Sequence, residues 1–227
     1  MNKFLFSTIL ILGMAAAPAA VLAEAEPPEI SLDGLELVEK TRRGELYAAP
    51  GIDWSVYDVI QLDKATVAFR KNWQRDQNRY QSFKVRDSDM EKIRNNLSEL
   101  FDKVFTEELS GNGGYQISNE TADNVMRITP RIVDLDVYAP DTRNVGNTKS
   151  FTESAGRMTL KLEIYDSVTG DLIATASDRR ESPRQGYMQW TTSVSNNADA
   201  RRMLQRWATG LRERLDDARN SSSGSTD

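Results

Sequence analysis

The sequence of 227 residues contains no cysteine and no histidine. Without cysteine, the chain forms no disulfide, thiolate nucleophile, thiolate metal site or lipid-modified cysteine. Without histidine, it lacks the most common general base near neutral pH and the most common zinc ligand. Ser-His-Asp, Cys-His and histidine-metal chemistry are therefore excluded. Carboxylate, lysine, tyrosine or Ser-Lys chemistry is still allowed, although the sequence has no Ser-x-x-Lys motif.

Long hydrophobic runs are also scarce, and the one at residues 1–23 has the composition of a signal peptide. Lys3 supplies a positive charge, Phe4–Met14 is apolar, and Val21–Ala23 offers a cleavage site. We expect cleavage after Ala23 and export to the periplasm. The alternative, a retained anchor, needs roughly 20 apolar residues, and Pro18 interrupts the run. No transmembrane segment is expected after the signal is removed.

The composition is acidic, with 34 Asp and Glu residues against 29 Lys and Arg residues and a formal net charge of -5. A general nucleic-acid-binding protein needs a concentrated basic face, so nucleic acid is not an expected partner. The chain is long enough for one domain with a hydrophobic core. We expect a flexible leader over residues 24–34, a single domain over 35–217, and a disordered, serine-rich tail over 218–227.

Hydrophobic patterning indicates the first elements of this domain. Residues 35–50 are typical of an extended arm or a short edge hairpin. β-branched residues predict a strand from Val56 to Phe69, with a break or bulge at Asp63. The polar segment Asn72–Ser82 is predicted to be a surface loop.

Two amphipathic helices are predicted. The first begins at Ser88, with Glu91 completing a capping box. It ends at Gly111, Gly113 and Gly114, because glycine accepts the left-handed conformation at the end of a helix. The second is capped by Asn196 or Asn197. Its apolar stripe consists of Ala200, Met203, Leu204, Trp207, Leu211 and Leu215.

Alternating apolar and polar residues predict further strands over 125–138, 158–164 and 172–177, the last two joined by a hairpin turn that ends at Gly170. In the first of these, Val133, Leu135 and Val137 are expected on the buried face. A polar loop is expected over 181–195. These elements predict an α+β fold: a two-layer sandwich of a mostly antiparallel sheet with two amphipathic helices on one face, and a parallel strand–helix–strand crossover.

The stretches LYAAPGIDWSVYDVIQLDKATVAFRKNWQRD, RITPRIVDLDVYAPD, SAGRMTLKLEIYDSVTGDLIATASDRRE and QWTTSVSNNADARRMLQRWA follow one another in a characteristic order. Together they resemble the bacterial domain of unknown function 3313 family, over about Leu35–Asp217. Members of this family are described as envelope lipoproteins, whereas this chain lacks the cysteine that carries the lipid. The resemblance implies a periplasmic protein without a lipid anchor, and it implies no catalytic residues.

Two segments with basic and aromatic residues form a candidate interaction surface. One follows the first strand and contains Arg70 and Trp73, and the other contains Arg179, Arg180 and Trp190. If their strands end at the same edge of the sheet, these residues form one surface for an anionic partner. The competing interpretation is that each arginine pairs locally and both indoles are buried under loops.

Three functions are left open. We favour a non-enzymatic periplasmic protein that binds another envelope component, a protein or a glycan, through its loops or an open sheet edge. The alternatives are a small-molecule or glycan binder that uses the aromatic-cationic loops, and a carboxylate-dependent hydrolase. No catalytic residue, cofactor or metal is expected, since Asp134 and Asp136 are too few ligands for calcium. The sequence does not specify the oligomeric state.

Overall fold

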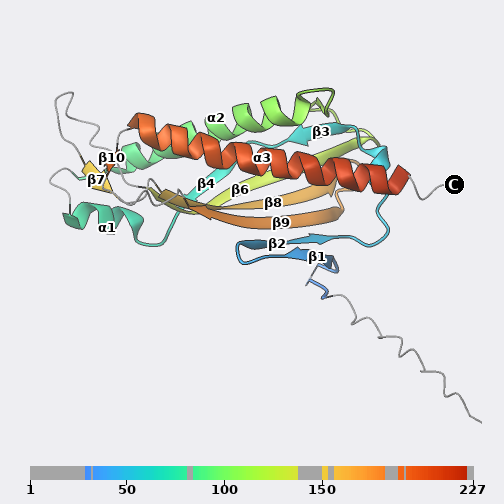
Figure 1. Cartoon of the computed structure of the whole chain (residues 1–227), viewed down its shortest axis with the longest axis horizontal. Helices are drawn as coiled ribbons and strands as arrows, with labels where there is room; N and C mark the ends of the chain where they lie inside the picture. Colours follow the sequence, from blue (N-terminus) through green and yellow to red (C-terminus); the bar gives the residue numbers. More distant parts are fainter. Residues whose placement is uncertain are drawn as a thin grey trace, which may run out of the picture.

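The structure is a computed structural model, and it describes residues 29–31, 33–80, 84–137, 150–152, 156–181, 189–191 and 193–223. These residues form an eight-stranded mixed sheet and a separate two-stranded sheet. Two long helices cover one face of the large sheet (Figure 1). The predicted α+β two-layer sandwich is therefore confirmed. The predicted signal peptide, residues 1–23, lies outside the described residues.

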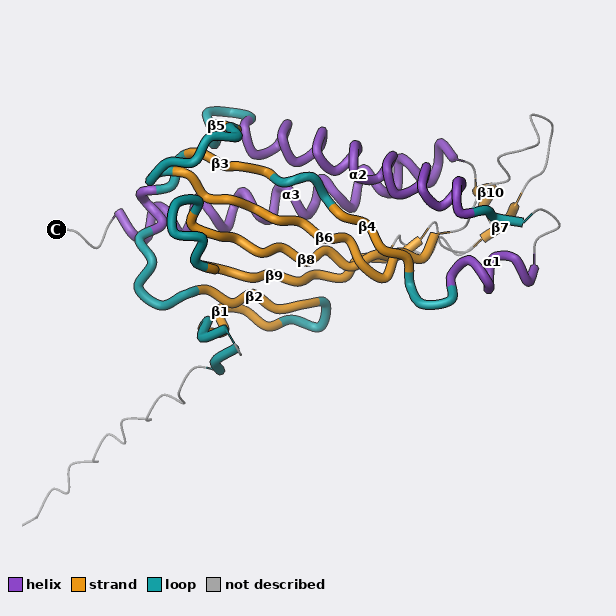
Figure 2. The backbone as a smooth tube through the Cα atoms, turned by 180° about the vertical axis from the view of Figure 1, so that it is seen from behind, coloured by secondary structure: helices purple, strands orange, loops and turns teal. Residues whose placement is uncertain are grey.

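The large sheet has the strand order β1-β2-β9-β8-β6-β3-β5, and β4 also pairs with β6 (Figure 2). β3 runs parallel to β5 and β6, and β4 runs parallel to β6, whereas the other neighbours are antiparallel. The predicted parallel link through a helix is thus present. The strands of this sheet are β1 (Glu36–Lys40), β2 (Gly44–Ala48), β3 (Val59–Leu62), β4 (Thr66–Phe69), β5 (Gln116–Ile117), β6 (Val125–Val137), β8 (Gly156–Asp166) and β9 (Leu172–Glu181).

The remaining elements are β7 (Ser150–Thr152) and β10 (Gln189–Thr191), which pair antiparallel, a short 3-10 helix at Trp54–Val56, and three α-helices. The α-helices are α1 (Trp73–Tyr80), α2 (Asp87–Ser110) and α3 (Ser193–Ser223). α2 and α3 lie side by side on the sheet, and α1 lies at the end of the sheet where β4 ends (Figure 1).

The core lies between the two long helices and the inward side chains of β6 and β8. Phe101 and Phe105 of α2 are fully buried, and their rings stack with centroids 3.8 Å apart. Ile128 and Ile132 of β6 are also fully buried beneath the helices, and so is Leu204 of α3. The periodicity that predicted the two apolar stripes therefore placed the buried faces of both helices correctly.

One arginine of α3 caps the end of α2. The Nη1 atom of Arg212 donates to the carbonyl oxygens of Leu109, at 2.9 Å, and Gly111, at 3.2 Å. Its Nε atom donates to Asp216 at 2.7 Å. A cation is favourable there because the last carbonyls of a helix carry partial negative charge. Arg212 therefore fixes the end of α2 against α3.

The predicted start of the first long helix is wrong by two residues. α2 begins at Asp87, and its N-cap is Arg86. The carboxylate that reaches back belongs to Asp89, which accepts from the backbone N–H of Arg86 at 2.9 Å. Asp89 reaches this amide because the N-cap is Arg86 rather than Ser88. The third helical position is therefore Asp89 rather than Glu91.

The predicted end of α2 at a glycine cluster is confirmed, with the left-handed glycine at Gly113. The helix ends before Gly111, but Gly111 has φ -65°. The left-handed conformations belong to the next two residues, Asn112 with φ 50° and Gly113 with φ 74°. Asparagine and glycine are the residues that adopt this conformation most readily.

The predicted surface loop at Asn72–Ser82 is also a correction, because α1 occupies most of it. The amide of Asn78 in this helix accepts from the backbone N–H of Val85 at 2.6 Å and donates to its carbonyl at 3.1 Å. Trp73 is buried at 1% exposure. The helix is polar on its other faces, so one buried indole gave no periodic signal.

The last helix is longer than predicted at both ends. α3 begins at Ser193, ahead of the predicted cap at Asn196 or Asn197, and continues to Ser223. The predicted disordered tail is therefore helical as far as Ser223. The hydroxyl of Ser222 accepts from the backbone N–H of Trp54 at 3.1 Å, which holds this last turn against the body of the protein.

The N-terminal arm forms the predicted edge hairpin. β1 and β2 pair antiparallel, and β2 joins β9. Part of the predicted flexible leader is held against β1, because Ile30 bridges to Glu36 and the carboxylate of Glu29 pairs with Lys40 at 3.1 Å.

A bulge changes which face of β6 is buried. Asp134 has φ 52°, and the pairing register with β8 shifts between Val133 and Asp136. The bulge adds one residue, so the inward positions pass from Ile132 to Leu135 rather than from Val133. Leu135 is buried, but Val133 is only partly buried on the other face, which corrects the prediction for Val133.

The hairpin of β8 and β9 matches its prediction. Met158, Leu160, Leu162 and Ile164 alternate as buried residues along β8. Gly170 adopts φ 74° in the turn.

Candidate functional site

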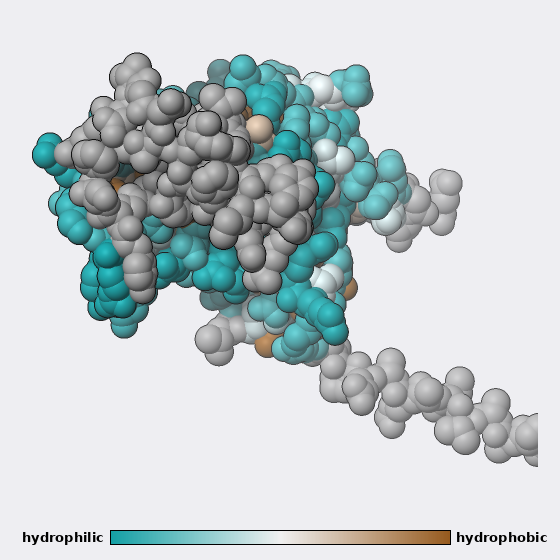
Figure 3. Space-filling view, turned by 60° about the vertical axis from the view of Figure 1, so that its left-hand side comes forward, coloured by the Kyte–Doolittle hydropathy of each residue, from teal (hydrophilic) through white to brown (hydrophobic). Residues whose placement is uncertain are grey.

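The two predicted basic-aromatic segments begin at the same end of the sheet. β9 is antiparallel to β8, β8 is antiparallel to β6, and β6 is parallel to β4, so β4 and β9 end together. The described surface visible at this end is mostly hydrophilic (Figure 3). The condition for one composite surface is therefore met at the level of the strands.

The side chains at that end do not assemble as predicted. The indole of Trp73 stacks on Phe69, with ring centroids 4.2 Å apart, and donates to the carbonyl of Val137 at 2.8 Å. Because Trp73 is buried, it is not available to a partner, which corrects its assignment to the surface. The side chain of Trp190 lies outside the described part of the structure.

Arg70 is held in a chain of local ion pairs. It contacts Asp76 at 2.7 Å and Asp136 at 2.9 Å, and Asp136 also contacts Arg157 at 2.8 Å. The hydrogen bond from Arg70 lowers the pKa of Asp76 below its usual value. Local pairing, the competing interpretation for this arginine, is therefore what the structure contains.

Arg179 and Arg180 lie on opposite faces of the sheet because they are neighbours in β9. Arg179 pairs with Thr159 on the uncovered face and is exposed. Arg180 lies on the helix side, where its Nε atom donates to Asp178 at 2.9 Å. A surface that uses Arg70 and Arg179 stays a prediction, but Arg180 belongs to a different site.

That site is a groove between α3 and the edge hairpin, which we call the α3 groove. Neighbouring strands lie about 4.8 Å apart, so the seven strands in the main path span about 29 Å. Two helices packed about 8–10 Å apart cover about 20 Å. β1 and β2 therefore extend past the helices (Figures 1 and 2), and the space between them and α3 has a volume of about 430 Å³.

The walls of the α3 groove are mostly apolar, and small residues on the sheet create its depth. On β9 the inward positions hold Ala174 and Ala176, whereas β8 beside it carries leucine and isoleucine. Ala48 of β2 lies opposite Ala174. The apolar lining includes Leu46, Ala48, Leu160, Leu162, Ala174 and Ala176 on the sheet and Trp207, Gly210, Leu211, Leu215 and Ala218 on α3.

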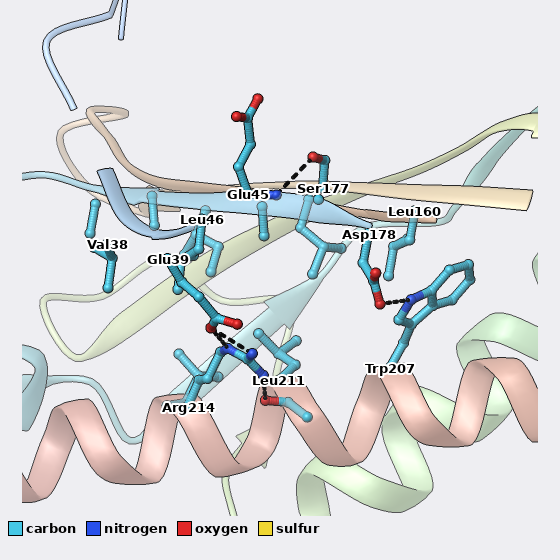
Figure 4. Close-up of a pocket in the computed structure, with 18 of the residues that line it drawn as sticks. Val38, Glu39, Glu45, Leu46, Leu160, Ser177, Asp178, Trp207, Leu211 and Arg214 are labelled. Atoms are coloured by element: carbon cyan, nitrogen blue, oxygen red, sulfur yellow. Dashed lines mark hydrogen bonds and ion pairs between the residues drawn. The ribbon is translucent and has the colours of Figure 1, made fainter. Parts of the chain in front are cut away.

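Two polar contacts bridge the α3 groove (Figure 4). At one position the carboxylate of Asp178 accepts from the indole Nε1 of Trp207 at 2.9 Å. At the other, the carboxylate of Glu39 in β1 accepts from Nη2 of Arg214 in α3 at 2.7 Å. Both contacts join the sheet to α3.

Cations outnumber anions at the Asp178 end of the α3 groove. Besides Arg180, the guanidinium of Arg43 lies 3.4 Å from this carboxylate and is 62% exposed. Arg206 lines the same groove and forms no ion pair or hydrogen bond with another residue that the structure describes. Asp178 thus pairs with two arginines, and Arg206 is a third arginine in the lining of the groove.

A second, more open hollow lies between α1, β4 and α2. Arg70, Trp73 and Arg94 line it, and the guanidinium of Arg94 lies 5.4 Å from the ring centroid of Phe69. It presents little apolar surface, so it is a weaker candidate than the α3 groove for a bound ligand.

Sequence reasoning missed the α3 groove, apart from Arg180. A detectable signal was present in LIATASD, where two alanines occupy alternate positions of a strand. Their significance depends on which strands pair and on where α3 ends, and neither can be read from local patterning.

Within the described ranges, no cluster of three or more acidic side chains is arranged to hold a metal ion. Within the same ranges, no helix combines the length and the apolar character needed to cross a bilayer.

Several solved structures are similar at low identity. Protein XCC0632 from Xanthomonas campestris is 13% identical with a TM-score of 0.43, and the match covers 78% of this chain and 93% of that one. The PelC dodecamer from Paraburkholderia phytofirmans is 11% identical with a TM-score of 0.37, covering 74% and 97%. A minor lipoprotein from Acinetobacter baumannii is 18% identical with a TM-score of 0.29, covering 74% and 95%. At these scores the likeness carries no argument about function.

No curated protein matches this sequence. The model of one protein family, described as "protein of unknown function (DUF3313)", matches residues 30–211, which include β1 to β10 and the part of α3 as far as Leu211. This match covers most of the chain and agrees with the resemblance found in its sequence. The chain belongs to the DUF3313 family.

Proposed function

We propose that this protein is an exported, non-enzymatic binding protein that holds an apolar ligand of the cell envelope in the α3 groove. The observation that carries the proposal is the apolar groove itself, formed where alanines of β9 and β2 face α3. Its volume of about 430 Å³ falls within the range of about 300–1,000 Å³ that is typical of small-molecule sites.

The groove combines the two features of a ligand site. Apolar side chains such as Leu46 and Leu211 line its walls, and a few polar groups stand at fixed positions where the sheet and α3 are bridged. Apolar walls supply binding free energy when they are removed from water, and fixed polar groups orient the ligand. Larger side chains at Ala174 and Ala176 would fill the space.

Binding without catalysis is supported by the chemistry of the groove. The chain has no histidine or cysteine, and the two carboxylates that bridge the groove are already engaged. Asp178 accepts from Trp207 and Arg180, and Glu39 accepts from Arg214. A carboxylate held by a cation is poorly suited to act as a general base.

Export is supported by the signal-like composition of residues 1–23. We expect the mature protein to begin at Glu24. Intact-mass measurement of protein released from the periplasm tests this expectation, and a mass that still includes the hydrophobic N-terminus contradicts it.

Binding of the neutral apolar dye N-phenyl-1-naphthylamine tests the ligand site. We expect its fluorescence to rise with the wild-type protein, and Ala176→Phe to weaken its affinity by about tenfold or more because the ring occupies the groove. Thr175→Phe is the matched control, since it adds a ring to the same strand on the uncovered face. Equal dye binding by the two variants, or no binding by the wild type, rejects the proposal.

A further inference from the structure

We propose that the occupant of the α3 groove is a single-chain anionic lipid, a long-chain fatty acid. Its carboxylate lies at the end that contains Arg43 and Arg206, and its chain lies along α3 toward Trp54. This inference rests on the proposed function and adds the class and the orientation of the ligand. Three observations support it, namely the length of the groove, its width and the distribution of charge along it.

The α3 groove is elongated along the helix. Its lining residues on α3 run from Arg206 to Ser221. At 1.5 Å per residue, this stretch is about 22 Å long. The hydrocarbon core of a bilayer is about 30 Å thick, so the acyl chain of one leaflet extends about 15 Å. One extended acyl chain therefore fits lengthwise.

The groove is narrow across its short dimension. Asp178 joins Trp207, and Glu39 joins Arg214, so the sheet and α3 are linked at two places along the groove (Figure 4). These links leave room for one flexible chain beside them rather than for two chains. The volume of about 430 Å³ also suits one chain.

Charge differs between the two ends. Asp178 pairs with Arg43 and Arg180, and Arg206, which also lines the groove, has no partner among the described residues. Arg206 can therefore bind an added anion, together with the exposed guanidinium of Arg43, whose one ion pair within the described residues is with Asp178. Guanidinium groups recognise carboxylates through paired, charge-assisted hydrogen bonds.

The rest of the groove does not attract an anion. Glu39 and Arg214 neutralise each other. At the Arg43 end, Glu45 also lines the groove, but its carboxylate points away from α3 (Figure 4). Toward the far end the lining includes Trp54 and Ala218, together with Asp217, which repels an anion. The headgroup therefore belongs at the Arg43 and Arg206 end, and the apolar chain belongs at the Trp54 end.

The test compares a fluorescent fatty acid, 11-(dansylamino)undecanoic acid, with its methyl ester, using the mature full-length chain at pH 7.4. The wild type is expected to bind the acid about tenfold more tightly than the ester, since a charge-assisted hydrogen bond is worth about that factor. Arg43→Gln combined with Arg206→Gln is expected to remove this preference and leave the affinity for the ester unchanged.

Arg42→Gln combined with Arg179→Gln is the matched control. It makes the same change in charge at exposed positions outside the groove, so the preference for the acid is expected to persist. Arg206→Gln alone, at an exposed position, provides a second variant if the double variant does not fold.

Each outcome is decisive. Equal binding of acid and ester by the wild type overturns this inference and leaves the proposed function standing, whereas binding of neither probe overturns both. Loss of the preference in the control pair overturns the assignment of Arg43 and Arg206. Displacement of the dansyl acid by palmitate supports a fatty acid as the source, and stronger displacement by palmitoyl-lysophosphatidylglycerol overturns it.

Discussion

Beneath α2 the sheet carries large apolar side chains, whereas beside α3 its outer strands carry alanines. On the α2 side, Phe101 and Phe105 are fully buried against the sheet. On the other side, Ala174 and Ala176 face a helix that does not reach over β1 and β2. One sheet thus supports both a closed core and an open groove, because it is wider than its helix layer. The closed part supplies the stability that allows the other part to stay open.

The largest expected effect comes from removing a side chain from the closed part. Phe101→Ala should lower the free energy of unfolding by about 3–5 kcal/mol, because it leaves a cavity in the fully buried core. Leu211→Ala, on the groove wall, should cost less than about 2 kcal/mol, since part of that side chain already faces the groove. Urea denaturation measures both. Equal losses contradict the distinction between the two parts.

A buried polar contact should give stability that depends on pH. Tyr57 donates to Asp166 at 2.9 Å, and burial, together with this contact, raises the pKa of Tyr57 to about 12. An unfolded tyrosine releases its proton near pH 10. The contribution of Tyr57 to the free energy of unfolding is therefore complete below pH 10 and is lost as the pH rises to about 12. This loss amounts to about 2–3 kcal/mol.

Tyr57→Phe isolates this dependence, because the other tyrosines titrate equally in both proteins. Urea denaturation at several pH values should give a shallower alkaline decline for the variant. Parallel declines contradict the assignment to Tyr57.

Larger side chains should also distinguish the closed core from the open groove. Ser98 is buried in α2, and its hydroxyl donates to the carbonyl of Ala65 at 2.7 Å. Ser98→Phe should destabilise the protein by about 1–3 kcal/mol or more through overpacking and loss of that bond. Ala176→Phe should change stability by less than about 1 kcal/mol, because the added ring enters the groove. Thermal unfolding measures the stability of both variants. A loss of stability in Ala176→Phe comparable to that in Ser98→Phe shows that the groove is not open.

The smallest expected effect is at the bridge between Glu39 and Arg214. Both side chains are nearly half exposed, so Glu39→Gln should change stability by about 1 kcal/mol or less. The same change should speed the entry and release of the neutral dye, because it weakens one of the two links across the groove. Stopped-flow fluorescence measures these rates, and unchanged rates exclude a role for the bridge in access.

The features that sequence reasoning identified are those with a strong local signal. The apolar stripe containing Phe101 and the alternation along β8 were visible because each repeats several times. α1 was missed because its buried face reduces to one residue, Trp73. The shift at Asp134 was missed because a single residue in a left-handed conformation leaves the surrounding pattern of apolar residues almost unchanged.

The candidate site was harder to predict than the fold. The sequence analysis made a surface with Arg70 and Arg179 conditional on two strands ending at the same edge, and the strand directions meet that condition. The α3 groove depends instead on small side chains at inward positions of the sheet, on the number of strands, and on the path of α3. Those quantities are set by long-range pairing, such as that of β2 with β9, which no single segment of sequence reveals.

Arg212 has a mechanical consequence for access to the groove. Its guanidinium binds the carbonyls of Leu109 and Gly111 at the end of α2, while its backbone belongs to α3. These hydrogen bonds link the two helices and oppose sliding of one helix along the other. The width of the groove therefore depends on where the β1–β2 hairpin lies relative to two helices that are tied to each other.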